Sequence, residues 1–121
     1  MSDPHTAPWT LLTGLADPYP TAHDSSPRRA VPNLKVIERL EGATVVRLSF
    51  RPGDEMADHQ APAPILILGQ TGDVSVTVDA GDGRAVTENL TPGRALHIEP
   101  RRKHSLVARE AATVTLVILT Q

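Results

Sequence analysis

The chain of 121 residues lacks cysteine altogether and has only three aromatic residues, one each of Trp, Tyr and Phe. Without thiols the protein forms no disulfide, holds no thiolate-bound metal and has no cysteine nucleophile. The absence of cysteine also fits a reducing compartment. With so few aromatic side chains, the protein offers little surface on which nucleic-acid bases could stack.

Neither an excess of basic charge nor a long hydrophobic run is present. The formal net charge is -2, so there is no positive field to attract a nucleic-acid backbone. The longest apolar run, residues 62–68, is far too short to cross a bilayer. The first residues have neither the basic nor the apolar segment of a signal peptide. We therefore expect a cytoplasmic protein that binds neither nucleic acid nor membranes.

Proline is unevenly distributed and divides the chain near residue 34. Residues 1–34 carry prolines at positions 4, 8, 18, 20, 27 and 32, which is too frequent for a long helix. We expect this segment to be an irregular arm. Its apolar side chains Trp9, Leu11, Leu12 and Leu15 need cover, which either the outer face of the same domain or a partner subunit could provide.

Beyond the arm, the pattern of apolar residues has the period of two that is typical of half-buried strands. The alternation occurs in four segments, residues 45–50, 74–78, 95–99 and 113–118. Residues 65–68 are apolar on both faces, as in a central strand. Turn-forming residues separate these segments, and the length suits one domain. The sequence therefore predicts an all-β sandwich or barrel over residues 35–121.

Two histidines stand in similar local settings within this β region. His59 follows Gly53 by six residues and His104 follows Gly93 by eleven, and each glycine belongs to a Pro-Gly turn. Each histidine also stands where an extended segment meets a loop. We expect the two imidazoles to converge inside one small β-barrel.

The first of these settings resembles the first sequence motif of the cupins, a family of small jelly-roll barrels. That motif is a Gly, five residues, His-x-His, three or four residues, Glu, six residues and Gly. Gly53, His59 and Gly72 fit it in register. Ala61 stands in place of the second His, and Ile65 stands in place of the Glu.

The second setting resembles the second cupin motif, which is a Gly, five residues, Pro-x-Gly, two residues and His. Gly93 and His104 fit this spacing. Glu99 stands in place of the Pro and Arg101 in place of the Gly, with Pro100 between them. The resemblance implies a single-domain cupin jelly-roll β-barrel with an irregular N-terminal arm.

In metal-binding cupins the two motifs direct three His and one Glu at one ion. Here the resemblance leaves only His59 and His104, and two imidazoles alone hold a divalent ion such as Fe, Mn, Ni or Zn weakly. His5 or His23 could add a ligand from the arm. Asp58 is next to His59 and should point to the opposite side of an extended segment.

Three functions from different classes remain open. Because only one of them is an enzyme, the sequence leaves open whether the chain is one. The first is small-molecule binding without a tightly held metal, in a largely apolar pocket lined by His59, His104, Ile65, Ile67 and Phe50. The second is a metal-dependent cupin enzyme of the dioxygenase, decarboxylase or isomerase type. The third is a non-catalytic, dimeric structural or interaction protein. We also expect a homodimer, because jelly rolls keep open sheet edges that need covering.

Two further features have alternative interpretations. His97 has the parity of outward-facing residues in the segment 95–99, so we expect it at the surface. The run Arg101–Lys103 precedes His104. It is either a solvated loop or a positive patch that attracts an anionic ligand to the mouth of the barrel.

Overall fold

The structure is a computed structural model that describes residues 7–19 and 30–120, so His5 and His23 lie outside the described residues. Every regular element among the described residues is a β-strand. In chain order the strands are β1 (Asn33–Leu40), β2 (Ala43–Phe50), β3 (Glu55–His59), β4 (Ile65–Thr71), β5 (Val74–Gly81), β6 (Arg84–Leu90), β7 (Ala95–Ile98), β8 (His104–Ala108) and β9 (Ala112–Leu119).

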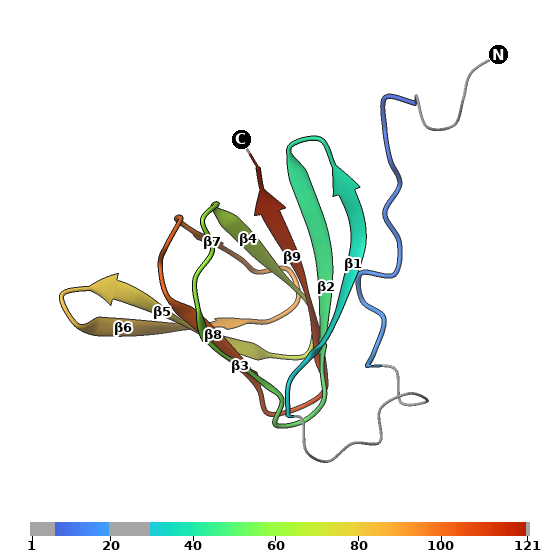
Figure 1. Ribbon diagram of the computed structural model, residues 1–121. Coiled ribbons are helices and arrows are strands. Elements are labelled where there is room, and N and C mark those ends of the chain that lie inside the picture. The colour runs from blue at the N-terminus through green and yellow to red at the C-terminus, as the bar shows by residue number, and fades with distance from the viewer. Residues whose placement is uncertain (1–6, 20–29, 121) are drawn as a thin grey trace.

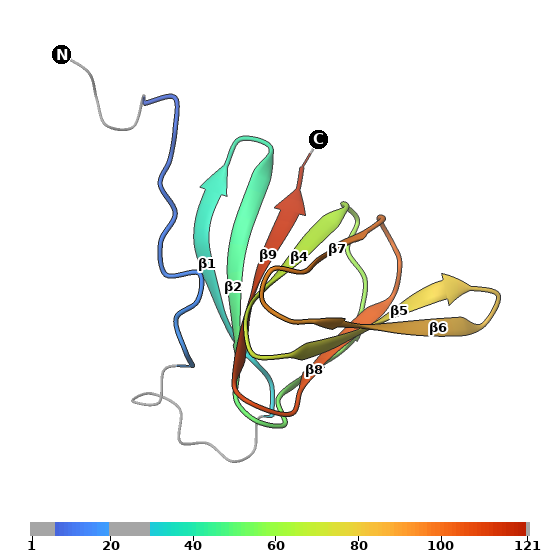
Figure 2. The same cartoon turned by 180° about the vertical axis from the view of Figure 1, so that it is seen from behind.

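The strands form two antiparallel sheets (Figures 1 and 2). One has five strands in the order β1-β2-β9-β4-β7, and the other has four in the order β3-β8-β5-β6. Apart from the hairpins β1-β2 and β5-β6, neighbours in each sheet come from distant parts of the chain, as in a jelly roll. The predicted all-β jelly-roll barrel is therefore confirmed. The first strand begins at Asn33, close to residue 35, where the sequence predicts the barrel to start.

The core lies between the two sheets and follows the predicted alternation. On β2, Leu48 and Phe50 are each 1% exposed and belong to the core cluster, together with Val46. Ile65 and Ile67 of β4 are buried in the same cluster, whereas Leu66 and Leu68 are half-buried and outside it. Side chains on alternate positions of β2 and β4 thus fill one interior.

Glycine is required at two places where the backbone approaches another segment closely. At Gly69 a Cβ would lie 2.4 Å from the carbonyl oxygen of Thr91. Gly72 has a φ of +69°, and a Cβ there would lie 2.5 Å from the carbonyl oxygen of Ala111. Any side chain at these positions would displace backbone, so both glycines fix the end of β4 against its neighbours.

The hairpin of β5 and β6 projects from the barrel on the side away from the arm (Figures 1 and 2). β6 is exposed along its whole length except at Leu90. The described part of the arm, residues 7–19, contains no strand or helix. It runs beside β1 and leaves Trp9 74% exposed and Leu11 83% exposed.

The arm is attached to the five-stranded sheet by polar contacts. Asp17 approaches Arg47 of β2 at 3.8 Å, and the guanidinium of Arg51 lies 4.4 Å from the ring centroid of Tyr19. These contacts place residues 17–19 against their own barrel. No helix in the described residues is long and apolar enough to span a membrane.

Candidate functional site

The site begins with an irregularity in the pairing of β3 with β8. Met56 pairs with Leu106 and His59 pairs with His104, but two residues of β3 lie between these pairs against one of β8. Such a β-bulge changes the face to which the following side chain points. In a regular strand without the bulge, His59, three residues after Met56, would lie on the opposite face. The bulge therefore turns His59 to the face on which Met56 packs against the core.

His59 and His104 are in direct ring contact. Their ring centroids are 4.1 Å apart and the ring planes make an angle of 65°. Nδ1 of His59 lies 2.9 Å from the carbonyl oxygen of Ala57, and Nδ1 of His104 lies 2.9 Å from that of Arg102. A carbonyl oxygen only accepts hydrogen bonds, so each Nδ1 is the donor and carries a proton. In the neutral rings each Nε2 then presents a lone pair.

Burial sets the charge state of His104. The side chain is buried on the inner face of β8. This desolvation lowers the pKa of His104 below its ordinary value of 6.5; the Arg102 carbonyl raises it, nearby His59 lowers it, and Asp58 raises it. Desolvation is the largest of these effects. His104 is therefore neutral near pH 7, and its Nε2 is a hydrogen-bond acceptor.

The residues near the pair do not fit a firmly bound metal. No group of three or more His, Cys, Asp or Glu that could hold an ion occurs in residues 7–19 and 30–120. Ala61 packs against the core and Ile65 is buried in it, so neither motif position offers a donor atom. Asp58 borders a separate polar hollow with Lys103. A divalent ion would meet two imidazoles, which is fewer ligands than a stable site needs.

The histidines continue into a row of residues that share one face of the four-stranded sheet. Val78 of β5 pairs with His104, and Val86 of β6 pairs with Val78. Directly paired residues of an antiparallel sheet project to the same face. His59, His104, Val78 and Val86 therefore form one line across the four-stranded sheet, which we call the histidine row.

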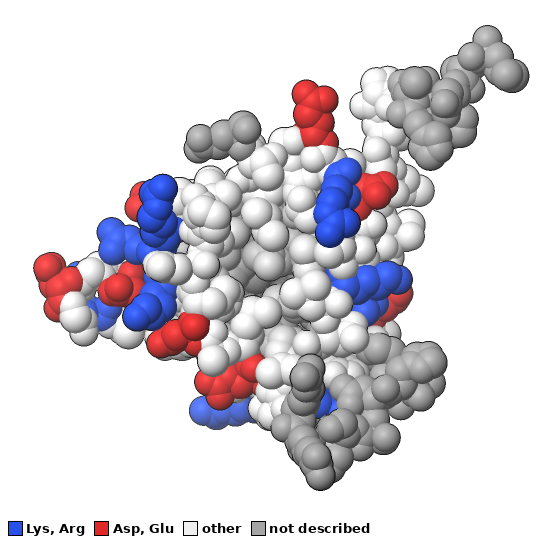
Figure 3. Space-filling model, in the orientation of Figure 1, with Lys and Arg blue, Asp and Glu red and all other residues white. Residues whose placement is uncertain are grey.

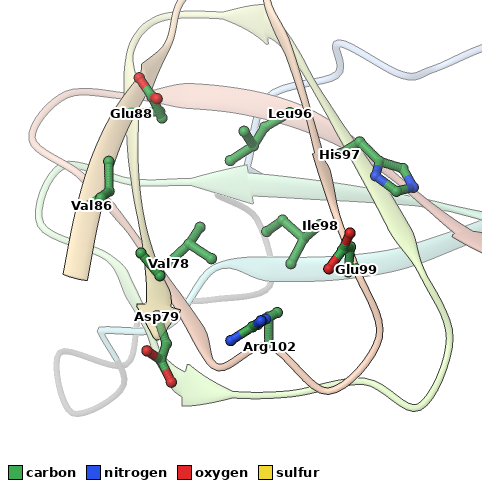
Figure 4. Close-up of a pocket in the computed structure, with 10 residues that line it drawn as sticks. Val78, Asp79, Val86, Glu88, Leu96, His97, Ile98, Glu99 and Arg102 are labelled. Atoms are coloured by element: carbon green, nitrogen blue, oxygen red, sulfur yellow. The ribbon is translucent and has the colours of Figure 1, made fainter. Parts of the chain in front are cut away.

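Val78 and Val86, at the far end of the histidine row, line a hollow that the sequence did not predict, and His59 and His104 are not among its lining residues. It has a volume of about 290 Å³ and lies between the β5–β6 hairpin and β7 (Figure 4). Val78 and Val86 line one side, and Leu96 and Ile98 of β7 line the other. In Figure 4 the side chains of Val78, Leu96 and Ile98 point toward its middle. The signal in the sequence was the alternation at these positions, but only the pairing of distant strands brings them together.

Charged side chains stand at the rim of this hollow. Those that border it are Asp79, Glu88, Glu99 and Arg102, and His97 lies among them. All five are exposed, and His97 is exposed as the alternation predicts. On the face in Figure 3 the charged residues lie around the margin and over the β5–β6 hairpin, and the centre is uncharged.

The three apolar residues predicted to line the pocket are members of the core. Phe50, Ile65 and Ile67 are 1–3% exposed. Phe50 also borders a second hollow, of about 270 Å³, with Pro18 and Tyr19 of the arm. The structure thus brings the two histidines together and places the three apolar residues in the packed core.

Comparison with known proteins identifies the fold. No protein-family model matches the sequence, and no curated protein matches it. Among solved structures, a cupin superfamily protein from Desulfitobacterium hafniense matches with a TM-score of 0.66 and 17% sequence identity, over 93% of this chain and 100% of that chain. The chain has a cupin fold.

Two further structures agree with this cupin assignment. An RmlC-like cupin from Shewanella frigidimarina has a TM-score of 0.66 and 17% identity, over 78% of this chain and 80% of that chain. An oxalate oxidase has a TM-score of 0.68 and 14% identity, over 79% of this chain and 53% of that chain. Identities this low establish the shared cupin barrel and carry no activity from one protein to another.

Proposed function

We propose that this chain is a small-molecule-binding cupin whose ligand contacts His59 and His104, without a tightly held metal. The observation that carries the proposal is the pair of Nε2 lone pairs. Both Nδ1 atoms are held by backbone carbonyls, and the rings touch at 4.1 Å between centroids. Two adjacent acceptors in a partly apolar setting are suited to orient a ligand or exchange a proton with it.

The surroundings support an organic ligand in preference to an ion. Val78, which pairs with His104, lines an apolar hollow of about 290 Å³, close to the lower size of known ligand pockets, which is about 300 Å³. Phe50, Ile65 and Ile67 belong to the buried core. In this proposal they form the closed end of the pocket.

The test is nuclear magnetic resonance of the histidine side chains during titration with a panel of small amines, alcohols and carboxylates. A ligand of this site should shift the ring signals of His59 and His104 and leave those of the exposed His97 almost unchanged. The variants His59→Ala and His104→Ala should each weaken binding at least about tenfold, as expected when a buried hydrogen bond is lost. If no compound in the panel perturbs either ring, the proposal is wrong.

A metal-dependent enzyme is the alternative, because the two free Nε2 atoms are also potential ligands and an oxalate oxidase shares the fold. Elemental analysis of protein purified without chelators separates the two functions. Near-stoichiometric Fe, Mn, Ni, Zn or Cu would favour the enzyme. Metal well below one equivalent would favour the organic ligand.

We also propose that the protein is a homodimer in the cytoplasm. The exposure of Trp9 and Leu11, 74% and 83%, supports an arm that is completed by a partner subunit. Light scattering at micromolar concentration tests this: the wild type should be a dimer and Trp9→Ala should shift it toward monomer. A monomeric wild type would contradict it.

A further inference from the structure

We propose that the ligand is a small amphipathic amine, with an apolar body in the hollow at the end of the histidine row and its ammonium group between the rim carboxylates and the two Nε2 atoms. This inference rests on the proposed function, because it assumes that the histidines and the hollow form one binding site. Two independent observations point to the same ligand chemistry.

The first observation is the hydrogen-bonding direction of the histidines. Backbone carbonyls hold Nδ1 of His59 and of His104 as donors, so the atoms left for a ligand are acceptors. In the described residues, the fully buried side-chain nitrogen and oxygen atoms that lack a partner are Arg47 Nε and Ser49 Oγ. Neither Nε2 atom is among them. A ligand must therefore bring donors, and an ammonium group brings three.

The second observation is the charge at the rim of the hollow. Asp79, Glu88 and Glu99 border it and carry three negative charges, against one positive charge on Arg102. Of the basic run before His104, Lys103 borders the separate polar hollow together with Asp58. The rim therefore favours a cation over an anion. The run Arg101–Lys103 therefore does not give this hollow a positively charged rim.

The wall of the hollow decides between a bare ion and an organic cation. Val78, Val86, Leu96 and Ile98 offer no donor atoms and favour contact with carbon. A metal ion would gain nothing from them. A benzyl or short alkyl group would bury apolar surface there while its ammonium group stays at the charged rim.

Three isosteric probes test the charge preference: benzylamine, benzyl alcohol and benzoate. They are titrated at pH 8, above the ordinary pKa of histidine and below that of an alkylamine. Binding is measured by calorimetry and by the ring signals of His59 and His104. We expect benzylamine to bind at least about fivefold more tightly than benzyl alcohol and benzoate to bind most weakly, with the amine preference shrinking as salt is added.

Matched variants assign the preference to the rim. The double variant Glu88→Gln/Glu99→Gln should weaken benzylamine binding about fivefold and leave benzyl alcohol binding unchanged. Arg102→Gln should strengthen benzylamine binding, because it removes the positive charge. Glu110→Gln, which changes an exposed carboxylate outside this rim, should have no effect.

The outcomes separate this inference from the proposed function. If benzoate or benzyl alcohol shifts the ring signals as strongly as benzylamine does, or if the Glu88→Gln/Glu99→Gln variant binds all three probes as the wild type does, the amine assignment is overturned and the histidine pocket stands. If none of the three probes shifts either ring and the wider panel also fails, the pocket itself is overturned.

Discussion

His59 and His104 face each other across the pairing of β3 with β8, with ring centroids 4.1 Å apart and Nδ1 of each ring on a backbone carbonyl. The arrangement fixes both tautomers through backbone that is itself part of the fold. Neither ring can rotate freely without giving up its hydrogen bond. The pair is thus preorganised to act on a ligand with its two Nε2 atoms.

The burial of His104 makes stability depend on pH. Burial lowers the pKa of His104 in the folded protein, whereas in the unfolded chain the imidazole titrates near 6.5. As the pH falls through that value, the unfolded chain takes up a proton that the folded protein does not, so the free energy of unfolding decreases. We expect urea unfolding to show lower stability at about pH 5.5 than at about pH 7.5.

The variant His104→Gln tests whether this residue causes the loss. It removes the titration, so the difference in stability between the two pH values should be smaller than in the wild type. His97→Gln, at an exposed position, should keep the wild-type difference. If His104→Gln and the wild type lose the same free energy of unfolding between these two pH values, groups other than His104 cause the loss of stability in acid.

Metal affinity should follow the number of donor atoms at the pair. The resemblance to the cupin motif places a second histidine at position 61, where this chain has Ala61. We expect Ala61→His to bind zinc or nickel at least about tenfold more tightly than the wild type in calorimetric titrations, because a third imidazole completes a minimal site. Ala85→His is the control, because Ala85 is exposed on β6. Equal affinity in the wild type and Ala61→His would mean that position 61 does not face the pair.

Local patterns predicted an all-β sandwich or barrel, because period-two alternation and Pro-Gly turns are properties of a few neighbouring residues, and the resemblance to the two cupin motifs narrowed this to a cupin jelly roll. The spacing of Gly53 with His59 and of Gly93 with His104 also predicted that the two rings would converge, and they touch. These features needed no knowledge of which strands pair. Each strand carries its own signal for which face is buried.

The remainder of the site depends on long-range pairing, which alternation does not encode. The bulge in β3 is one extra residue, and the sequence has no distinct signal for it. Val78 and Val86 belong to the site only because β5 lies between β8 and β6. Arg102 and Lys103 are neighbours in the chain but border different hollows, so their charges do not add at one mouth.

Truncating a side chain should lower the free energy of unfolding more on one face of β4 than on the other. Ile67 is 1% exposed in the core, whereas the preceding residue, Leu66, which points to the opposite face, is half-buried and outside the core cluster. We expect Ile67→Ala to lower the free energy of unfolding by about 2–5 kcal/mol because it leaves a cavity. Leu66→Ala should cost about 1 kcal/mol. Urea unfolding of both variants decides this, and a larger loss in Leu66→Ala would reverse the assigned faces.

Gly72 and Gly83 separate the cost of backbone conformation from the cost of a steric clash. Their φ angles are nearly equal, +69° and +73°, but a Cβ at Gly72 would lie 2.5 Å from the Ala111 carbonyl oxygen, whereas nothing lies within 4 Å of one at Gly83. Gly83→Ala should therefore lower the free energy of unfolding by about 1–2 kcal/mol, the cost of a left-handed alanine. Gly72→Ala carries the same cost and must also move the backbone that joins β8 to β9. We expect its loss in urea unfolding to exceed that of Gly83→Ala by at least about 1 kcal/mol. Equal losses would mean that the β4–β5 turn and residue 111 can separate at no cost, and that the close approach does not hold this end of the barrel together.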